Sequence, residues 1–279
     1  MRIESTIDAA EFRRRAETFL ARDPLRHTII TTMVDNCVAG TSVVDPLFAA
    51  VYADGAVVGV AMDTPGRGVC LGELPDAALA ELAGTFFAGD PDMPGVDGGP
   101  LSGLAFARSW RALSGKDFRQ TGSTRLYRFA DPGSPVVSGR ARPATDSDVA
   151  ICVEFAERMR RDSGIGPDPR SVPARVAVGH LWLWEDGARP VAIAGHQIRS
   201  FGWTRIAPVY TPPEFRRRGY ASALTARVSK MLRDNGSQVC LCTDIGNPTS
   251  NKIYQDIGYR PVCDFLQYTF DTRTDPAGS

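Results

Sequence analysis

The chain has 279 residues, with 32 basic and 32 acidic side chains and a formal net charge of zero. This length suits two domains, and the balanced charge gives no overall field that would draw in nucleic acid or a membrane surface. The sequence has no run of 18 apolar residues and no apolar core behind its first positive charge, which argues against a membrane span and a signal peptide. We therefore expect a cytoplasmic protein.

Charge is unevenly divided along the chain. Residues 1–139 carry a net charge of −4 and residues 140–279 a net charge of +4. A basic second half suits a polyanionic ligand. However, 29 of the 32 basic residues are Arg, so composition alone explains part of this bias.

The six cysteines lack metal-finger or Cys-x-x-Cys spacing. We interpret them as small apolar packing residues in a reducing compartment, and we expect no metal. A disulfide or metal pair is the alternative, most plausibly at Cys240 and Cys242, which share one side of a predicted strand.

The first half of the chain begins with a charged helix around Glu11–Arg15 and then alternates short strands with helices. A hairpin is predicted where two apolar runs flank the turn formers Asp54-Gly55. The elements that follow are strand 69–72, helix 75–88, a short strand near Val96, helix 101–113 and strand 124–130.

Turn formers cluster at 131–135, which we interpret as a linker. The sequence Thr145-Asp146-Ser147-Asp148 then predicts a capped helix. It is followed by helix 171–179, a hairpin of 181–184 with 191–194, strand 202–209, helix 219–234, strand 238–243, helix 249–257 and strands through Phe270. The last residues, 271–279, are predicted to be disordered.

The most informative segment joins strand 202–209 to helix 219–234. It contains three consecutive arginines, Arg216, Arg217 and Arg218, followed by Gly219. Glycine lets the backbone approach a ligand closely, and the amides and dipole at a helix N-terminus attract anions. This combination predicts a diphosphate site; a solvated Arg cluster at a loop–helix junction is the alternative. The glycine and lysine patterns of Walker and Rossmann phosphate loops are absent.

This segment resembles the acyl-CoA-binding signature of the GNAT superfamily of N-acetyltransferases, Gln/Arg-x-x-Gly-x-Gly/Ala, which appears here as Arg216 to Ala221. The flanking order of elements, through the segments Asn247–Tyr254 and Ile257-Gly258-Tyr259, matches the same superfamily. The resemblance implies an α/β (α+β) fold with a mixed, mostly antiparallel central sheet flanked by helices, and acetyl-CoA as the acyl donor.

The resemblance also implies site residues. The acyl and pantetheine parts of acetyl-CoA would be held along the strand, the pyrophosphate by amides of the loop and helix start, and the pantetheine arm also by an Asn after the next strand. In this chain these are Val209, Tyr210, Thr211, Arg216, Arg217, Arg218, Gly219, Tyr220, Ala221, Ser222 and Asn247.

Tyr254 would be the general acid that protonates the leaving thiolate; packing in the core is the alternative. Asn247 could equally act only as a helix N-cap before Pro248. No histidine lies near the signature, so the general base is open: Asp244 and Glu185, each acting through water, are the candidates, and the superfamily often uses no single base.

Residues 1–130 repeat the order of elements of residues 136–270, which predicts a tandem arrangement. In the first copy, Glu73 and Asp76 stand where the second has arginines, and Phe106 stands in place of Tyr254. We therefore expect domain 1–130 to be a degenerate GNAT-like lid or wall of the acceptor pocket, and domain 136–270 to be catalytic. An unrelated α/β cap is the alternative for the first domain.

The resulting hypothesis is an acetyl-CoA-dependent N-acetyltransferase acting on a small-molecule or peptide amine, as a monomer or homodimer. A non-catalytic acyl-CoA-binding regulatory module is the alternative from another class, and use of a longer acyl chain stays open. A nucleic-acid ligand is not expected, because the Arg cluster is short.

Overall fold

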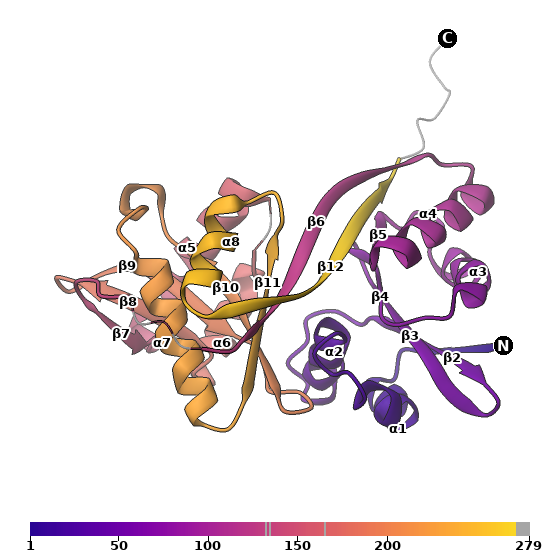
Figure 1. Cartoon of the computed structure of the whole chain (residues 1–279), viewed down its shortest axis with the longest axis horizontal. Coiled ribbons are helices and arrows are strands. Elements are labelled where there is room, and N and C mark those ends of the chain that lie inside the picture. The colour runs from indigo at the N-terminus through magenta and orange to yellow at the C-terminus, as the bar shows by residue number, and fades with distance from the viewer. Residues whose placement is uncertain (132, 134, 165, 272–279) are drawn as a thin grey trace, which may run out of the picture. The chain divides into compact units, whose positions relative to one another are not determined.

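The structure is a computed structural model that describes residues 1–131, 133, 135–164 and 166–271 (Figure 1). The chain forms two compact units. The first contains Met1–Leu126, Asp244–Gly246 and the chain from Cys263 onward, and the second contains Tyr127–Thr243 and Asn247–Val262.

The first unit has strands and helices in the order that the sequence predicted, with two additional elements, strand β1 and helix α2. They are β1 (Arg2–Thr6), α1 (Ala9–Leu20), α2 (Thr28–Val38), β2 (Leu47–Ala53), β3 (Ala56–Thr64), β4 (Gly68–Leu71), α3 (Leu79–Gly89), β5 (Gly95–Gly98), α4 (Pro100–Ser114) and β6 (Phe118–Phe129), whose last residues enter the second unit.

The second unit repeats this order. Its elements are β7 (Arg140–Pro143), α5 (Val149–Ser163), α6 (Val172–Ala177), β8 (Leu181–Asp186), β9 (Arg189–His196), β10 (Trp203–Tyr210), α7 (Tyr220–Asp234), β11 (Gln238–Asp244), α8 (Pro248–Asp256) and β12 (Tyr259–Phe270). The repetition confirms the predicted tandem arrangement.

Each unit has a mostly antiparallel sheet with one parallel pair, which confirms the predicted fold class. The parallel pair is β4 with β5 in the first unit and β10 with β11 in the second. A helix connects the two strands in both cases, α3 in the first and α7 in the second, because parallel neighbours require a crossover.

Local sequence explains the hairpins. Asp54 and Gly55 both have positive φ, 49° and 79°, in the turn between β2 and β3. Gly187 and Ala188 have φ of 55° and 64° between β8 and β9. Two consecutive residues of positive φ characterise the tight hairpin turns whose twist matches that of the strands.

Helix α5 begins as the sequence predicted. Thr145 and Asp148 form a capping box in which each side chain bonds the other residue's backbone N–H. Arg142 on β7 donates to both carboxylate oxygens of Asp148, at 2.6 and 2.9 Å. The hydrogen bonds from Arg142 hold the pKa of Asp148 far below its usual range, so the cap keeps its charge.

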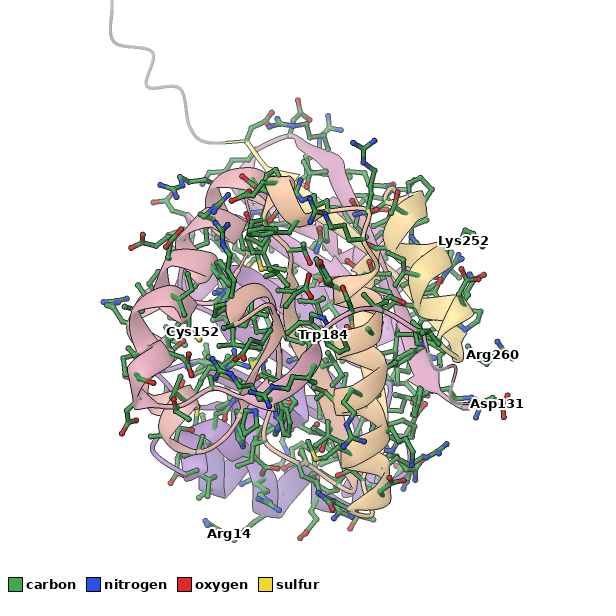
Figure 2. The ribbon with its side chains drawn as sticks, turned by 90° about the vertical axis from the view of Figure 1, so that its left-hand side faces the viewer. Arg14, Asp131, Cys152, Trp184, Lys252 and Arg260 are labelled. Carbon is green, nitrogen blue, oxygen red and sulfur yellow. The ribbon has the colours of Figure 1, made fainter. Side chains whose placement is uncertain are left out.

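The second unit packs helices on both faces of its sheet. Helix α7 covers one face through Leu224, Val228 and Leu232, and α5 and α6 cover the other through Phe155 and Val176. Figure 1 shows this arrangement, and Figure 2 shows Trp184 inside the unit while Lys252 and Arg260 project outward.

The predicted division of the chain differs from the observed units at the C-terminus. Strand β12 extends beyond the second unit, and its residues Leu266–Thr269 pair with Gly98–Gly95 of β5. These backbone hydrogen bonds place the end of the chain in the first unit. The boundary between units lies at Leu126 and Tyr127, ahead of the predicted linker 131–135.

Two predicted features fall partly or wholly outside the described residues. Residues 132 and 134 of the linker and residues 272–279 of the tail are not described. Asp271, the first residue of the predicted tail, is exposed and forms an ion pair with Arg119 at 2.8 Å.

No disulfide joins any of the six cysteines, and Cys152 and Cys240 are buried. Among the described residues, no group of three or more His, Cys, Asp or Glu side chains could hold a metal ion. No helix in the same part of the chain has the length and apolar character needed to cross a bilayer.

Candidate functional site

Strands β10 and β11 diverge in the second unit. Their parallel pairing runs from Trp203 opposite Gln238 to Ile206 opposite Leu241 and stops there, although β10 continues to Tyr210. On its other side, β10 stays paired with β9 but shifts register at a bulge between Ile206 and Val209. The bulge bends β10 away from β11, because an extra residue locally increases twist. The result is a sheet that opens between two parallel strands.

The loop after β10 has an unusual backbone. Arg217 has a φ of 63° and Gly219 a φ of 81°. A bulky residue with positive φ costs about 1–3 kcal/mol and occurs mainly at functional sites. Alternation between left- and right-handed residues turns successive N–H groups into one concavity that binds anions. Arg217, Arg218 and Gly219 are all exposed.

Helix α7 starts at this loop without a side-chain cap. Gly219 is its N-cap residue and no side chain accepts a hydrogen bond from the first turn. A helix leaves its first N–H groups unpaired, so the amides of Tyr220, Ala221 and Ser222 remain directed at the loop. Gly219 is also sterically restricted, because a Cβ built there would lie 3.0 Å from Val137.

Arg216 is held differently from its two neighbours. Its guanidinium donates to Asp162 on α5 at 2.6 Å and to the carbonyl of Thr211 at 2.9 Å. The hydroxyl of Tyr210 donates to the same Asp162 oxygen at 2.9 Å. Arg216 therefore ties the loop to α5 although it is exposed, whereas no ion pair is found for Arg217 or Arg218 among the described residues.

A second ion pair anchors the same loop. Arg158 on α5 donates to Glu214, with a shortest distance of 2.7 Å. Exposed pairs of this kind contribute about 0–1 kcal/mol each, so their main effect is to fix the loop before a ligand arrives. The sequence analysis missed these pairs, because Asp162 and Arg158 lie on a helix 54 and 56 positions before their partners Arg216 and Glu214 and give no signal in the sequence.

Tyr220 and Thr211 reveal which atoms near the loop are available. The Tyr220 side chain is buried and its hydroxyl donates to Asp186 at 2.6 Å. Only the Tyr220 backbone can therefore contribute to a ligand site. The Thr211 hydroxyl is buried and accepts or donates no hydrogen bond among the described residues, which is the signature of a polar group that awaits a ligand or water.

Asn247 acts as the N-cap of α8, the alternative noted from the sequence. Its side-chain oxygen accepts from the N–H of Ser250 at 3.0 Å, and its carbonyl accepts from the Asn251 side chain at 2.8 Å. Asn247 is exposed. The cap occupies the amide oxygen, so the NH₂ group is the part that can reach a ligand.

Tyr254 lies on α8 and packs against the same core cluster as Val209 of β10. Its ring meets Tyr259 edge-on, with centroids 6.0 Å apart. Burial raises the pKa of Tyr254 to about 12, so its hydroxyl stays protonated at neutral pH. Among the described residues this hydroxyl has no hydrogen-bond partner, whereas the neighbouring Tyr259 hydroxyl bonds Ser229 at 2.6 Å.

Comparison with known proteins identifies this architecture. The model of the FR47-like protein family matches residues 185–266. An acetyltransferase of the GNAT family from Colwellia psychrerythraea superposes with a TM-score of 0.61 at 12% identity, covering 97% of this chain and 100% of that chain. The chain has the GNAT fold.

Two further solved structures agree with this assignment of the fold. A Drosophila protein superposes with a TM-score of 0.66 at 12% identity, covering 96% of this chain and 98% of that chain. A GCN5-related N-acetyltransferase from Sphaerobacter thermophilus gives 0.54 at 16% identity, with 85% of each chain covered. No curated protein matches the sequence.

The two carboxylates considered as general base lie in contrasting settings within this GNAT fold. Glu185 pairs with Arg140 at 3.3 Å and also with Arg142, and the hydrogen bond from Arg142 lowers the pKa of its carboxyl. Both effects make Glu185 a poor base. Asp244 is exposed, accepts from the N–H of Gly246 at 2.8 Å, and belongs to the first unit rather than to the unit of Tyr254.

Proposed function

We propose that this protein is an acetyl-CoA-dependent N-acetyltransferase that transfers an acetyl group to a primary amine by direct attack on the thioester. One observation carries the proposal: the gap between β10 and β11 lies beside an uncapped helix start whose loop has positive φ at Arg217 and Gly219. A splayed strand can offer backbone N–H groups to an acyl carbonyl, and the loop can bind a diphosphate.

The residues present fit such a cofactor. The amides of Arg217 through Ser222 and the side chains of Arg217 and Arg218 would hold the pyrophosphate. Val209, Tyr210 and Thr211 would hold the acyl and pantetheine parts through their backbone, and the partnerless Thr211 hydroxyl would gain a hydrogen bond. The Asn247 NH₂ group would contact the pantetheine arm. Arg216 would act by fixing the loop through Asp162.

The reaction needs few protein groups. Acetyl-CoA supplies an activated acyl carbonyl. A neutral amine attacks that carbon, backbone N–H groups of β10 stabilise the oxyanion, and the carbon–sulfur bond breaks. Tyr254 then donates a proton to the leaving thiolate, and the amine proton departs to water. With a pKa of about 12, Tyr254 carries its proton at neutral pH.

Acetyl-CoA binding is tested by thermal unfolding. At about 100 times its dissociation constant, acetyl-CoA should stabilise the protein by about 2.7 kcal/mol. Gly219→Glu should remove this shift. The matched control is Gly236→Glu at the other end of α7, since Gly236 has the same φ of 81° and open space around it. An unchanged melting temperature of the wild type with acetyl-CoA would contradict the proposal.

Catalysis is tested by following free thiol release with a panel of amines. One alternative function has support in the structure: the paired state of Glu185 leaves it a poor base, which favours a non-catalytic acyl-CoA-binding module. Such a module would show the thermal shift but release no thiol with any amine of the panel. The role of the first unit as a lid or pocket wall stays a prediction.

A further inference from the structure

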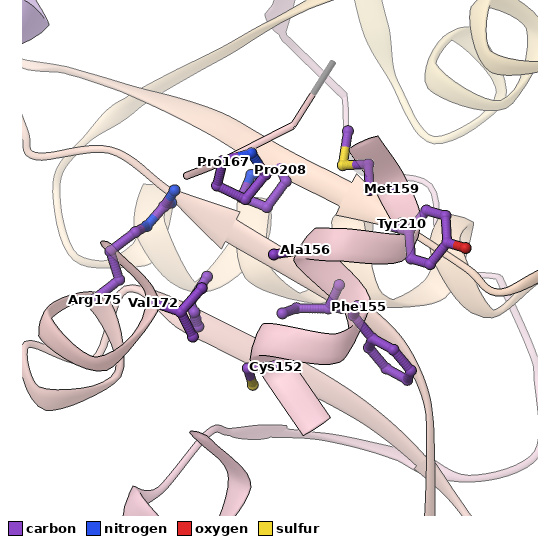
Figure 3. Close-up of a pocket in the computed structure, with 11 residues that line it drawn as sticks. Cys152, Phe155, Ala156, Met159, Pro167, Val172, Arg175, Pro208 and Tyr210 are labelled. Atoms are coloured by element: carbon purple, nitrogen blue, oxygen red, sulfur yellow. The ribbon is translucent and has the colours of Figure 1, made fainter. Parts of the chain in front are cut away.

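An apolar pocket lies beneath α5 and α6, on the face of β10 opposite α7 (Figure 3). Its walls come from α5, α6 and the strands β8, β9 and β10. Pro208 and Tyr210 of β10 line it, whereas Val209 between them packs on the α7 side. The pocket therefore borders the same stretch of β10 that diverges from β11.

One cation, Arg175 on α6, lines this otherwise apolar space. Its guanidinium donates to the carbonyl of Ala207 at 2.6 Å and to that of His196 at 3.1 Å. Figure 3 shows the charged end of Arg175 toward Pro167 and Pro208. Gly195 lies against it, because a Cβ at that position would lie 2.7 Å from Leu181, 2.9 Å from the guanidinium nitrogen and 3.0 Å from the His180 carbonyl. A side chain at position 195 would therefore disturb Arg175 together with its neighbours.

A second cation faces the same side of the sheet. Ile206 packs on the α7 side, so its neighbour Arg205 points to the opposite face, toward α5 and α6. The Nε atom of Arg205 is buried and has no hydrogen-bond partner among the described residues. Burial, and then the positive charge of Arg205, lower the pKa of Arg175 to about 10.

No carboxylate balances these two arginines among the described residues. Cys152 and Tyr210 also line the pocket, and burial raises the pKa of both, so both are neutral at neutral pH. The Asp162 carboxylate that accepts from the Tyr210 hydroxyl is paired with Arg216. The remaining titratable groups nearby are His180 and His196, whose rings lie 4.5 Å apart. Burial, the neighbouring histidine and Arg175 together lower the pKa of His180 to about 4. Burial, chiefly, also lowers the pKa of His196. Both imidazoles are therefore neutral at neutral pH, and the local charge comes from Arg175 and Arg205 alone.

Two adjacent cations without an acidic partner destabilise a folded protein, because each loses solvation and they repel each other. A core would normally lose such a pair or add an acid. Retention of an unpaired, partly buried charge is expected where a ligand supplies the opposite charge. The cavity beside the cations has a volume of about 10 Å³, enough for one water molecule, so its apolar walls would have to move apart to hold a hydrocarbon group of the same ligand.

We propose that the acceptor of this enzyme carries a carboxylate, bound by Arg175 and Arg205, with a small apolar group in the pocket formed by Cys152, Phe155, Met159, Val172, Leu181 and Ile193. An amino acid with an aliphatic side chain has this chemistry. The identity of the molecule as an acceptor rests on the proposed acetyltransferase function, whereas its binding as a carboxylate does not.

Binding is tested without acetyl-CoA, using isovalerate, its neutral amide isovaleramide, and inorganic phosphate as probes in calorimetry. Isovalerate should bind at least tenfold more tightly than isovaleramide. Equal affinity of the two would overturn the proposal. Tighter binding of phosphate than of isovalerate would overturn the carboxylate assignment and leave a phosphate site.

Arg205→Met is the decisive variant, because it removes a cation whose buried nitrogen lacks a partner. Preference for isovalerate over the amide should disappear, while the melting temperature stays equal to or rises above that of the wild type. The matched control is Arg227→Met, at an exposed position of α7, which should leave the preference intact. Retained preference in Arg205→Met would overturn the proposal.

Gly195→Ala probes this face of the sheet by a second route, since the added methyl group would crowd Leu181 and the His180 carbonyl as well as the Arg175 guanidinium. We expect at least a tenfold loss of isovalerate affinity. With acetyl-CoA, leucine should be acetylated at least tenfold more efficiently than 3-methylbutylamine, which lacks only the carboxylate. Carboxylate binding without any acetylation would refute the acetyltransferase function and keep the carboxylate site. Acetylation of leucine and 3-methylbutylamine at equal rates would refute the carboxylate site and keep the acetyltransferase function.

Discussion

The loops that follow β4 and β10 occupy the same position in the two units but differ in chemistry. After β4, the N–H of Glu73 donates to Nε2 of His27 at 3.0 Å, and its carbonyl accepts from Val60 at 3.2 Å. After β10, Arg217 and Gly219 have positive φ and lie exposed. In the loop after β4, the backbone groups of Glu73 form hydrogen bonds within the protein, whereas the loop after β10 is exposed to solvent.

The helices that follow β5 and β11 also differ in whether their aromatic side chain has an unpaired polar group. Phe106 on α4 is fully buried and packs near Phe86 and Trp110. Tyr254 on α8 is half-buried and keeps a hydroxyl group without a partner among the described residues. If the second unit binds acyl-CoA as proposed, the comparison implies that an acidic loop and one lost hydroxyl would be enough for the first unit to lose such a site while keeping its core.

The largest expected effect concerns stoichiometry. If only the second loop binds, calorimetry should give one acetyl-CoA per chain. The double change Arg217→Glu with Gly219→Glu should remove all binding, because carboxylates repel a diphosphate and lose solvation beside it. In the control variant, Gly236→Glu takes the place of Gly219→Glu beside Arg217→Glu. A second site that survives the double change would show that the first unit also binds acyl-CoA, and the comparison would fail.

The next effect concerns Tyr254. Loss of the proton donor in Tyr254→Phe should lower turnover roughly 10²-fold, the low end for general acids, with little change in acetyl-CoA affinity because the ring remains. Tyr259→Phe is the matched control: it removes a buried hydroxyl bonded to Ser229 and should affect stability more than turnover. Turnover of Tyr254→Phe within about threefold of wild type would assign Tyr254 to packing.

Much of the fold could be predicted because hydrophobic period, turn formers and caps act locally. The hairpin over Asp54-Gly55 and the cap at Thr145 are examples, since each depends on residues a few positions apart. Helix α2 was missed, because its sequence is rich in Thr, Ile and Val, which favour strands in isolation. Packing of Ile30 and Val34 in the core overrides that preference.

The predicted site was limited by the same distinction. The loop from Arg216 to Gly219 is visible in the sequence, whereas its attachment to Asp162 depends on how α5 packs. Arg175 and Arg205 carry no motif at all, and they are brought together only by the pairing of β9 with β10. The end of β12 belongs to the first unit because it pairs with β5. The hydrophobic periodicity of a sequence does not specify which strands pair.

A smaller effect tests how the first loop is closed. His27 is buried, and burial lowers the pKa of its imidazole. It is therefore neutral, with Nδ1 directed at the carbonyl of Asp23 and Nε2 accepting from Glu73. His27→Phe keeps the ring but leaves the Glu73 N–H without its acceptor, which should cost about 1–3 kcal/mol of unfolding free energy.

Denaturant unfolding measures this loss, and acetyl-CoA affinity supplies the control, since it should not change. If His27→Phe were as stable as the wild type, the first loop would not be held by this hydrogen bond. If instead acetyl-CoA affinity fell together with stability, the first loop would contribute to the ligand site, and the contrast between the two loops would be wrong.

The smallest effect concerns Asp97 on β5, in the parallel pair of the first unit. One carboxylate oxygen accepts from Gln267 at 3.3 Å, and the other is buried without a hydrogen bond among the described residues. Burial raises the pKa of Asp97 to about 6 from 3.8. An open ligand site could use such a group; in a closed copy it should be only a cost to stability.

The sign of the pH dependence follows from the raised pKa. Below about pH 4 the carboxyl is protonated in both folded and unfolded chains, and burial carries no penalty. Above about pH 6 it is ionised in both, and the folded state bears the full penalty, on the order of 1 kcal/mol for this half-buried group. Asp97→Asn should therefore be more stable than the wild type at pH 7, with the difference vanishing near pH 4. Urea unfolding of both proteins across this range measures it, and a difference that is constant with pH would mean that Asp97 does not titrate between 4 and 6.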